Sequence, residues 1–258
     1  MVARAMAWRQ LAPGLEWAEL RIGCAAPVWR ARLVVARLDP RLLELTLAMG
    51  HTPGTMRPAW TLERAPRDAL LAVNAGQFVG SMPWGWVVID GRQRLRPGRG
   101  PLSSAVAIDP AGRLRWAHGD SLPEAAGVVT GFQSYPTLLA RDGTVPRDLL
   151  EPNSLVNRTH RDIRLAFGET RDGFVLIAMT RFDAVGDVGS SLPLGPTTPE
   201  MAAIMGALGA RDAVMLDGGV SAQLLLRERA GGKPLQWRGW RKVPLALIAK
   251  ARAPQGMK

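Results

Sequence analysis

The chain of 258 residues contains a single cysteine, Cys24, and only three histidines. One cysteine cannot form an internal disulfide, and it cannot by itself supply a cysteine-based zinc site. The histidines at positions 51, 118 and 160 do not have the spacing of a zinc motif such as His-Glu-x-x-His. We therefore expect no protein-bound metal and no cofactor, and we predict that Cys24 is a small buried side chain.

Long apolar runs are also missing. No segment approaches the roughly 20 apolar residues that a membrane-spanning helix needs, because Arg, Asp or Gly interrupts each one. The first residues, MVARAMAWRQLAPG, lack the apolar stretch of about 7–15 residues that is typical of a secretory signal. We expect no membrane span, and this segment shows no export signal.

Lysine is scarce, whereas arginine is abundant. Of the 33 basic residues only four are Lys, which leaves 33 − 4 = 29 Arg, and the net charge is +11. Such a field attracts polyanions, and a guanidinium binds phosphate through two parallel hydrogen bonds. Phosphorylated glycans, anionic envelope polymers and nucleic acid are the candidate partners, while a compositional preference for Arg explains the charge equally well. Nucleic acid is the least favoured, because the basic residues are spread along the chain without an aromatic-interleaved motif.

The overall composition, with 47% hydrophobic and 21% charged residues, is that of an ordinary globular protein. Neither an internal repeat nor a low-complexity linker divides the chain. We therefore predict one domain over residues 1–258. Its fold class is α/β (α+β), with a mixed, β-sheet-rich core and a few flanking helices.

Apolar runs bounded by turn residues predict the individual elements. Residues 31–49 have the pattern of a hairpin around Asp39 and Pro40, and residues 163–180 that of a second hairpin around Asp172-Gly173. A helix is expected from Thr198, as its N-cap, to residue 208. The other expected elements are a short helix that begins at Thr61 and strands at 70–73, 86–90, 103–109, 113–116 and 213–216. Residues 131–139, which contain Pro136, are expected to be a loop that leads into a strand.

Two of these strands end in residues typical of a site. The apolar runs at 70–73 and 213–216 are followed at once by Asn74 and Asp217, and then by small residues. Small residues let the backbone approach a ligand closely, and a rigid strand aims the polar side chain. Taken alone, however, Asp217-Gly218-Gly219 is more typical of a hairpin turn.

Together with further segments in the same order, these strand ends resemble the phosphodiester glycosidase family. Ala75 and Gln77 stand where that family has Gly and Phe, and Val220 stands in place of a third Gly. The matching segments are NAGQF at 74–78, Pro83 with the strand at 85–88, PTLL at 136–139, RLAFG at 164–168, Asp172-Gly173, the helix at 198–208, LDGGVS at 216–221 and RKVP at 241–244.

The resemblance implies a hydrolase that cleaves the glycosidic C1–O bond of a sugar-1-phosphodiester. Its substrate would be a phosphorylated glycan, another anionic envelope glycan or a sugar phosphate, and its location would be outside the cytoplasm. The alternative is a non-catalytic protein of the same fold that binds a glycan or a phosphate, because fold alone does not determine activity.

The chemistry of C1–O cleavage narrows the candidate catalytic residues. A phosphate monoester has a second pKa near 6, so it departs readily and an arginine can take the place of a general acid. Arg164 is the candidate for this role. Asp217 is the candidate to activate water or to attack the anomeric carbon. Glu200 is a possible second carboxylate, although an acid at a helix start also stabilises the helix dipole.

Substrate-binding roles are expected around these residues. Asn74 and Ser221 would donate hydrogen bonds to sugar hydroxyls or phosphate oxygens. Asp183 belongs to a turn-rich segment, where an exposed loop carboxylate is the alternative reading. The remaining expected binding residues are Gly76, Gly218, Gly219 and Arg241. The hypothesis requires that Asp217 and Arg164 reach one cleft.

Overall fold

The structure is a computed structural model that describes residues 6–23, 30–51, 55, 57–118, 121–122, 126–154, 156–182 and 195–253. Cys24 and Asp183, to which the sequence assigns a buried position and a binding role, lie outside the described residues. Within the described ranges, no helix is both long and apolar enough to cross a membrane.

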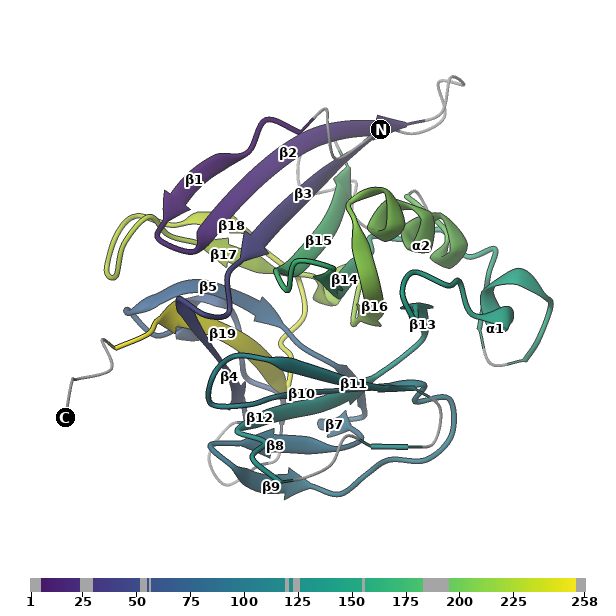
Figure 1. Ribbon diagram of the computed structural model, residues 1–258, viewed down its shortest axis with the longest axis horizontal. Coiled ribbons are helices and arrows are strands. Elements are labelled where there is room, and N and C mark those ends of the chain that lie inside the picture. Colours follow the sequence, from purple (N-terminus) through teal and green to yellow (C-terminus); the bar gives the residue numbers. More distant parts are fainter. Residues whose placement is uncertain are drawn as a thin grey trace.

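Antiparallel strands, arranged in four sheets in the part of the chain that the structure describes, are the main regular structure of the molecule (Figure 1). The largest sheet contains, in spatial order, β1 (Arg9–Ala12), β2 (Leu15–Gly23), β3 (Arg30–Leu38), β15 (Val175–Phe182), β14 (Leu165–Thr170), β16 (Ala210–Leu216) and β13 (Thr137–Leu139). A second sheet contains β18 (Leu235–Trp237), β17 (Leu224–Leu226), β5 (Ala69–Asn74), β19 (Leu245–Ala251) and β4 (Leu43–Met49).

A third sheet contains β11 (Leu114–His118), β10 (Ser104–Ile108), β12 (Thr130–Ser134), β8 (Val87–Ile89) and β9 (Arg92–Leu95). The two-stranded sheet pairs β6 (Gln77–Val79) with β7 (Met82–Trp84). The helices in the described ranges are α1 (Arg147–Leu150) and α2 (Thr198–Ala207), with 3-10 turns at Leu62–Arg64 and Gly219–Ser221.

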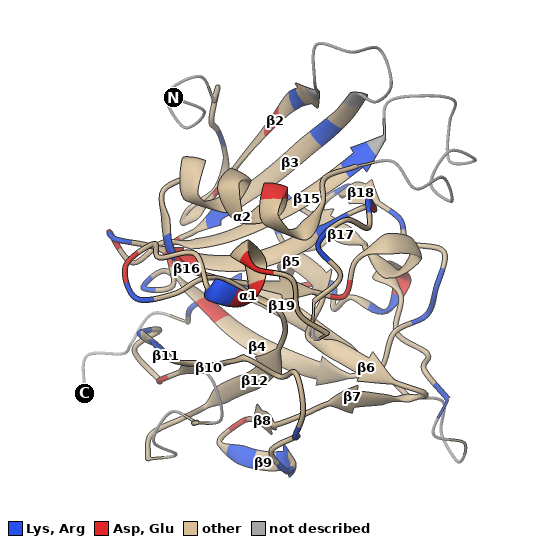
Figure 2. Cartoon of the chain, turned by 90° about the vertical axis from the view of Figure 1, so that its right-hand side faces the viewer, with Lys and Arg blue, Asp and Glu red and all other residues tan. Residues whose placement is uncertain are grey.

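The three larger sheets share one apolar core. Phe132 of β12 and Phe167 of β14 meet edge to face in it, with their ring centroids 5.5 Å apart. On its other face the seven-stranded sheet is covered by α2, whose Met201 and Met205 belong to a second apolar cluster that also contains Val35 and Met215. In Figure 2 basic residues, coloured blue, lie on several elements, including β3, β9 and α1, so the positive charge is not gathered on one element.

The prediction of a sheet-rich fold with few helices is confirmed. The α/β label is too loose, because an α/β fold is built on parallel strands and every strand pair in the described residues is antiparallel. The hairpin around Asp172-Gly173 is also confirmed, because β14 and β15 pair from Leu165 opposite Met179 to Glu169 opposite Val175.

The predicted hairpin at 31–49 is wrong, although both of its strands exist. β3 pairs with β2 and β15, whereas β4 pairs with β19, so the turn carries the chain from one sheet to another. The Asp39 carboxylate stabilises this turn by accepting hydrogen bonds from the Arg41 backbone N–H (2.9 Å) and guanidinium (2.8 Å). A turn fixed in this way points β4 away from β3.

Two further boundaries differ from the prediction. The N-cap of α2 is Thr197, whose hydroxyl accepts from the Glu200 N–H (3.3 Å) while the Glu200 carboxylate accepts from the Thr197 N–H (2.7 Å). Residues 130–134, expected within or beside a loop, form β12 in the centre of the third sheet. A cis peptide bond between Tyr135 and Pro136 then joins β12 to β13, so the proline lies between two strands and not inside one.

Candidate active site

Strand pairing brings Arg164 and Asp217 to the same edge of the seven-stranded sheet. Leu165, the first residue of β14, is opposite Leu216, the last residue of β16. Because the two strands are antiparallel, the residues just outside this pair, Arg164 and Asp217, leave the sheet side by side. Both side chains line one cavity of about 250 Å³.

The backbone of Asp217 is fixed by the end of β5. Its N–H donates to the Gly76 carbonyl (2.9 Å), and the Asn74 side-chain amide donates to the Asp217 carbonyl (2.7 Å). The Asn74 side-chain carbonyl in turn accepts from the Gln223 N–H (3.0 Å), and Asn74 is only 1% exposed. Asn74 therefore connects two strand ends from different sheets, and it does not line the cavity.

The two glycines after Asp217 allow the chain to pack tightly on the segment that precedes β14. A Cβ at Gly218 would lie 2.5 Å from the carbonyl oxygen of Ile163, and one at Gly219 would lie 2.9 Å from the Asp162 carboxylate. Gly219 also has a φ of +57°, a left-handed conformation that costs little only for glycine. The Gly219 N–H donates to the Ile163 carbonyl (2.8 Å). The glycines thus bring Asp217 next to Asp162 and Arg164.

The Asp217 carboxyl group has an unusual electrostatic environment. Its Oδ2 atom is buried and has no hydrogen-bond partner among the described residues. Burial raises the pKa of Asp217 to about 6, and the negative charge of Asp162 adds to this, while the Ser221 hydroxyl and the Arg241 charge act in the opposite direction. A carboxyl group with this pKa is ionised at neutral pH and is a stronger base than an ordinary aspartate.

The Arg164 guanidinium is largely buried and is positioned by backbone carbonyls. Its Nε donates to the Pro196 carbonyl (3.1 Å) and its Nη2 donates to the His160 carbonyl. Its Nη1 atom has no partner within the described part of the chain. Burial lowers the pKa of Arg164 from its ordinary value, and the charge of Asp162 partly restores it. The group stays cationic at any physiological pH.

Several residues that line the cavity carry no prediction from the sequence. Asp162 lies beside Arg164 and Asp217, and its Oδ2 is 3.6 Å from the Nε2 of His160. Gln77, Tyr135 and Asn157 add amide and phenol groups to the walls. Asp162 directly precedes the hairpin predicted at 163–180 and lies three residues before β14, so extending the search for polar side chains from strand ends to strand starts could have identified it.

The remaining candidates lie around the cavity. The Glu200 carboxylate accepts from the Arg161 guanidinium (2.8 and 3.0 Å) and from the Thr197 N–H, and it does not line the cavity. The Arg241 guanidinium lies 4.8 Å from the centroid of the Phe78 ring. Ser221 is 3% exposed, and its hydrogen bond to the Asp217 carboxyl group lowers the pKa of that group. No group of three or more His, Cys, Asp or Glu side chains in the described ranges could hold a metal ion.

The cavity thus combines a carboxylate of raised pKa with a fixed arginine at the end of two antiparallel strands. The family model described as phosphodiester glycosidase matches residues 67–250, which is more than half of the chain. The chain therefore belongs to the phosphodiester glycosidase family, and the resemblance seen in the sequence is confirmed. No match was found among the curated proteins.

Solved structures show the same fold at low sequence identity. The catalytic domain of zebrafish N-acetylglucosamine-1-phosphodiester alpha-N-acetylglucosaminidase, auto-inhibited by its pro-peptide, matches with a TM-score of 0.68 and 17% identity, over 93% of this chain and 85% of that one. A hypothetical protein from Synechocystis matches with a TM-score of 0.60 and 17% identity, over 96% and 64%. A putative exported protein from Burkholderia pseudomallei matches with a TM-score of 0.60 and 17% identity, over 88% and 75%.

Proposed function

We propose that the protein is a hydrolase that cleaves the glycosidic C1–O bond of a sugar-1-phosphodiester. The observation that carries the proposal is the shared cavity of Asp217 and Arg164, one a base and the other a fixed cation. These are the two groups that C1–O cleavage beside a phosphate requires. Membership of the family supports the reaction class.

In the proposed reaction, Arg164 stabilises the leaving group. The bond between C1 and the bridging oxygen breaks, and its electron pair stays on that oxygen, which departs as part of a phosphate monoester. Negative charge therefore grows on the phosphate as the reaction proceeds. A guanidinium that is already oriented by the Pro196 and His160 carbonyls can interact more strongly with this charge in the transition state than in the ground state.

Asp217 acts on the other partner of the reaction. As a general base it removes a proton from water while the water oxygen forms the new bond to C1; as a nucleophile it would bond to C1 itself before water releases the sugar. Asp162 is the second carboxylate of the site and takes the place that the sequence suggested for Glu200, because Glu200 is bound by Arg161. Its negative charge would stabilise the oxocarbenium-like sugar.

The test is hydrolysis of a panel of sugar-1-phosphodiesters in oxygen-18 water. We expect the label in the released sugar, because water attacks C1. Label found only in the phosphate would mean attack at phosphorus, and the proposal would be wrong.

Two variants distinguish catalysis from simple binding. Asp217→Asn is expected to lose at least about a hundredfold in kcat, as removal of a catalytic base does, and to keep its affinity for the diester. Asp172→Asn, in the exposed turn between β14 and β15, is the matched control and should keep its rate. A protein that binds the diesters and hydrolyses none of them would be the non-catalytic alternative.

A further inference from the structure

A second cavity lies beside α1, outside the candidate active site. Its volume of about 560 Å³ is more than that of the first cavity and falls within the range of roughly 300–1,000 Å³ typical of small-molecule sites. The start of β13, the turn that follows β13, α1 and the end of β11 enclose it. Pro136 lines both cavities, so the two are neighbours.

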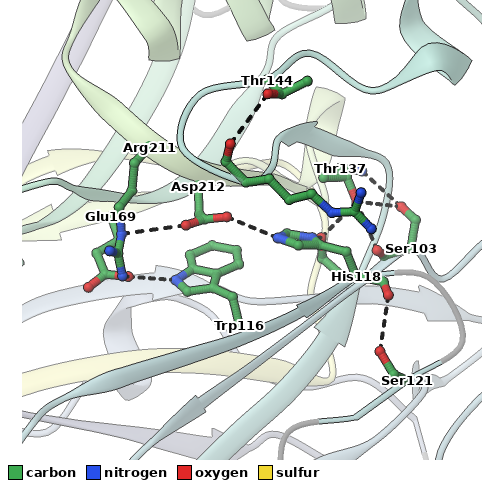
Figure 3. A network of polar contacts seen from close by, with 11 residues as sticks. Ser103, Trp116, His118, Ser121, Thr137, Thr144, Glu169, Arg211 and Asp212 are labelled. Carbon is green, nitrogen blue, oxygen red and sulfur yellow. Dashed lines mark hydrogen bonds and ion pairs between the residues drawn. The ribbon is translucent and has the colours of Figure 1, made fainter.

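One wall of this cavity is a rigid polar network around His118 (Figure 3). The His118 Nε2 lies 2.9 Å from Asp212 Oδ1, and its Nδ1 lies 3.0 Å from Ser104 Oγ. The imidazole also stacks on Trp116, whose indole N–H donates to Glu169 (2.8 Å). Because both ring nitrogens have partners, the network fixes the orientation of the imidazole that borders the cavity.

Hydroxyl groups extend this polar surface. Thr137, which is 5% exposed, donates from its hydroxyl to the Ser103 carbonyl (2.9 Å), and its N–H donates to the Ser103 hydroxyl (2.9 Å). Thr144 belongs to the turn after β13. Ser103, Thr137 and Thr144 line the cavity together with His118. The Ser103 and Thr144 hydroxyls can exchange hydrogen bonds with the hydroxyls of a sugar, whereas both nitrogens of the His118 imidazole are already bonded and the ring supplies a fixed surface.

The cavity is also lined by a positively charged side chain that has no partner among the described residues. Arg141 lines the cavity, and its guanidinium has no hydrogen bond or ion pair in the described part of the chain. Arg147 also lines it, but its Nε donates to Glu151 (3.1 Å). Arg141 therefore supplies a positive charge without a partner, and Asp148, which also lines the cavity, supplies a negative one.

The backbone around Arg141 is held in an unfavourable conformation. Arg141 and Asp142 have φ angles of 51° and 73°, in a tight turn closed by reciprocal hydrogen bonds of 2.8 Å between Ala140 and Thr144. Left-handed conformations are costly for residues with a side chain, and they concentrate where a protein binds ligands. The turn thus holds Arg141 at the cavity at some cost in stability.

We propose that this second cavity binds the anionic saccharide on the far side of the substrate phosphate. The inference rests on the proposed function, because the saccharide is the leaving group of that reaction. Arg141 pairs with its carboxylate or phosphate, the hydroxyl wall and Asp148 bind its hydroxyls, and Val145 and Pro146 contact the apolar face of its ring. Because Pro136 lines both cavities, a diester that occupies both would pass over this residue.

A kinetic comparison of two diesters tests the inference. One substrate is a sugar 1-(methyl phosphate), and the other carries a glucuronate-containing disaccharide in place of the methyl group. We expect Arg141→Gln to raise KM for the extended diester roughly tenfold, as loss of one charge-assisted hydrogen bond does, and to leave kcat and the KM of the methyl diester unchanged. Arg92→Gln, which removes the same charge from the exposed strand β9, should change neither.

The two proposals can fail separately. If the protein hydrolyses both diesters and Arg141→Gln affects them equally or not at all, the second cavity does not bind the leaving group and the hydrolase proposal stands. If the protein hydrolyses neither diester, the hydrolase proposal and the leaving-group role of the cavity both fall.

Direct binding of the glucuronate disaccharide, measured by calorimetry, tests the cavity without turnover. We expect binding that Arg141→Gln weakens and Arg92→Gln preserves. A second variant, Ala140→Trp, fills the cavity without changing its charge and should weaken binding too. Disaccharide binding that is unaffected by both cavity variants would overturn the inference.

Discussion

At the scale of single residues, the environment of Asp217 links activity to stability. Burial without a partner for Oδ2 makes its ionisation unfavourable, yet the ionised form is the one that the proposed reaction uses as base. The unfavourable ionisation of Asp217 lowers the stability of the folded protein, and the other contacts of the fold compensate for this loss. The cost can be measured in two independent ways.

The first measurement is the pH dependence of turnover. With a pKa of about 6, Asp217 is protonated below that pH, so kcat should fall about tenfold per pH unit on the acidic side and level off above pH 7. Steady-state kinetics between pH 4.5 and 8 check this. A rate that is constant across this range would exclude Asp217 as the base.

The second measurement is stability. The pKa of Asp217 in the folded state, about 6, lies above the ordinary value of 3.8, so ionisation costs stability as the pH rises through 6, and the cost vanishes below 3.8. Asp217→Asn should therefore stabilise the protein by about 2–3 kcal/mol at pH 8, and the gain should shrink as the pH is lowered toward 4. Denaturant unfolding at both pH values checks it. A gain that does not vary with pH would contradict this account.

At the scale of elements, the site depends on contacts between segments that are distant in sequence. Gly218 packs on the Ile163 carbonyl, and Asn74 joins the ends of β5 and β16. The sequence alone could indicate that both strands end in polar residues, because that is a local pattern. It could not indicate that Leu165 and Leu216 pair, and this pairing is what places Arg164 beside Asp217.

Gly218 provides a test at this scale. A Cβ there would meet a backbone oxygen at 2.5 Å, which cannot move without displacing the start of β14. We expect Gly218→Ala to lower kcat at least tenfold and to destabilise the fold by about 1–3 kcal/mol. Gly206→Ala in α2, where the nearest atom is 3.9 Å away, should instead be neutral or stabilising by up to about 1 kcal/mol. Equal effects of the two changes would contradict the packing argument.

The errors in the predicted elements have the same cause as the missed pairing of Leu165 with Leu216, because contacts between distant segments leave no local sequence pattern. The apolar residues at 31–49 correctly predict both strands. However, β4 pairs with β19, some two hundred residues further along the chain, and no local pattern in the sequence indicates this pairing. Thr197 and Thr198 are adjacent and equally suited to cap a helix, so only the backbone geometry distinguishes them. Pro136 correctly marked an interruption, and the strand that follows it is present as β13, but the strand before it, β12, was missed.

At the scale of the whole molecule, stability depends on a core that three sheets share. Phe167 and Phe132, from different sheets, are 0% and 1% exposed and touch in this core. The sheets therefore stabilise one another, and a cavity between them weakens all three.

Phe167→Ala tests this dependence. It should destabilise the protein by about 3–5 kcal/mol, with a single cooperative transition, because the lost contacts belong to more than one sheet. Val79→Ala, at a position 62% exposed, is the control and should change stability by less than about 0.5 kcal/mol. Unfolding of Phe167→Ala in two separate steps would show that the sheets are independent units.

In the part of the chain that the structure describes, backbone carbonyls and not carboxylates hold the Arg164 guanidinium in the cavity. Carbonyl oxygens orient a guanidinium without cancelling its charge, and the described residues include no carboxylate in ion-pair contact with it. Under the proposed function, an incoming phosphate has no existing ion pair with Arg164 to break and no guanidinium to reorient. Burial of the charged guanidinium costs stability, and under the proposed function a bound phosphate offsets this cost, so ligand binding should stabilise the fold.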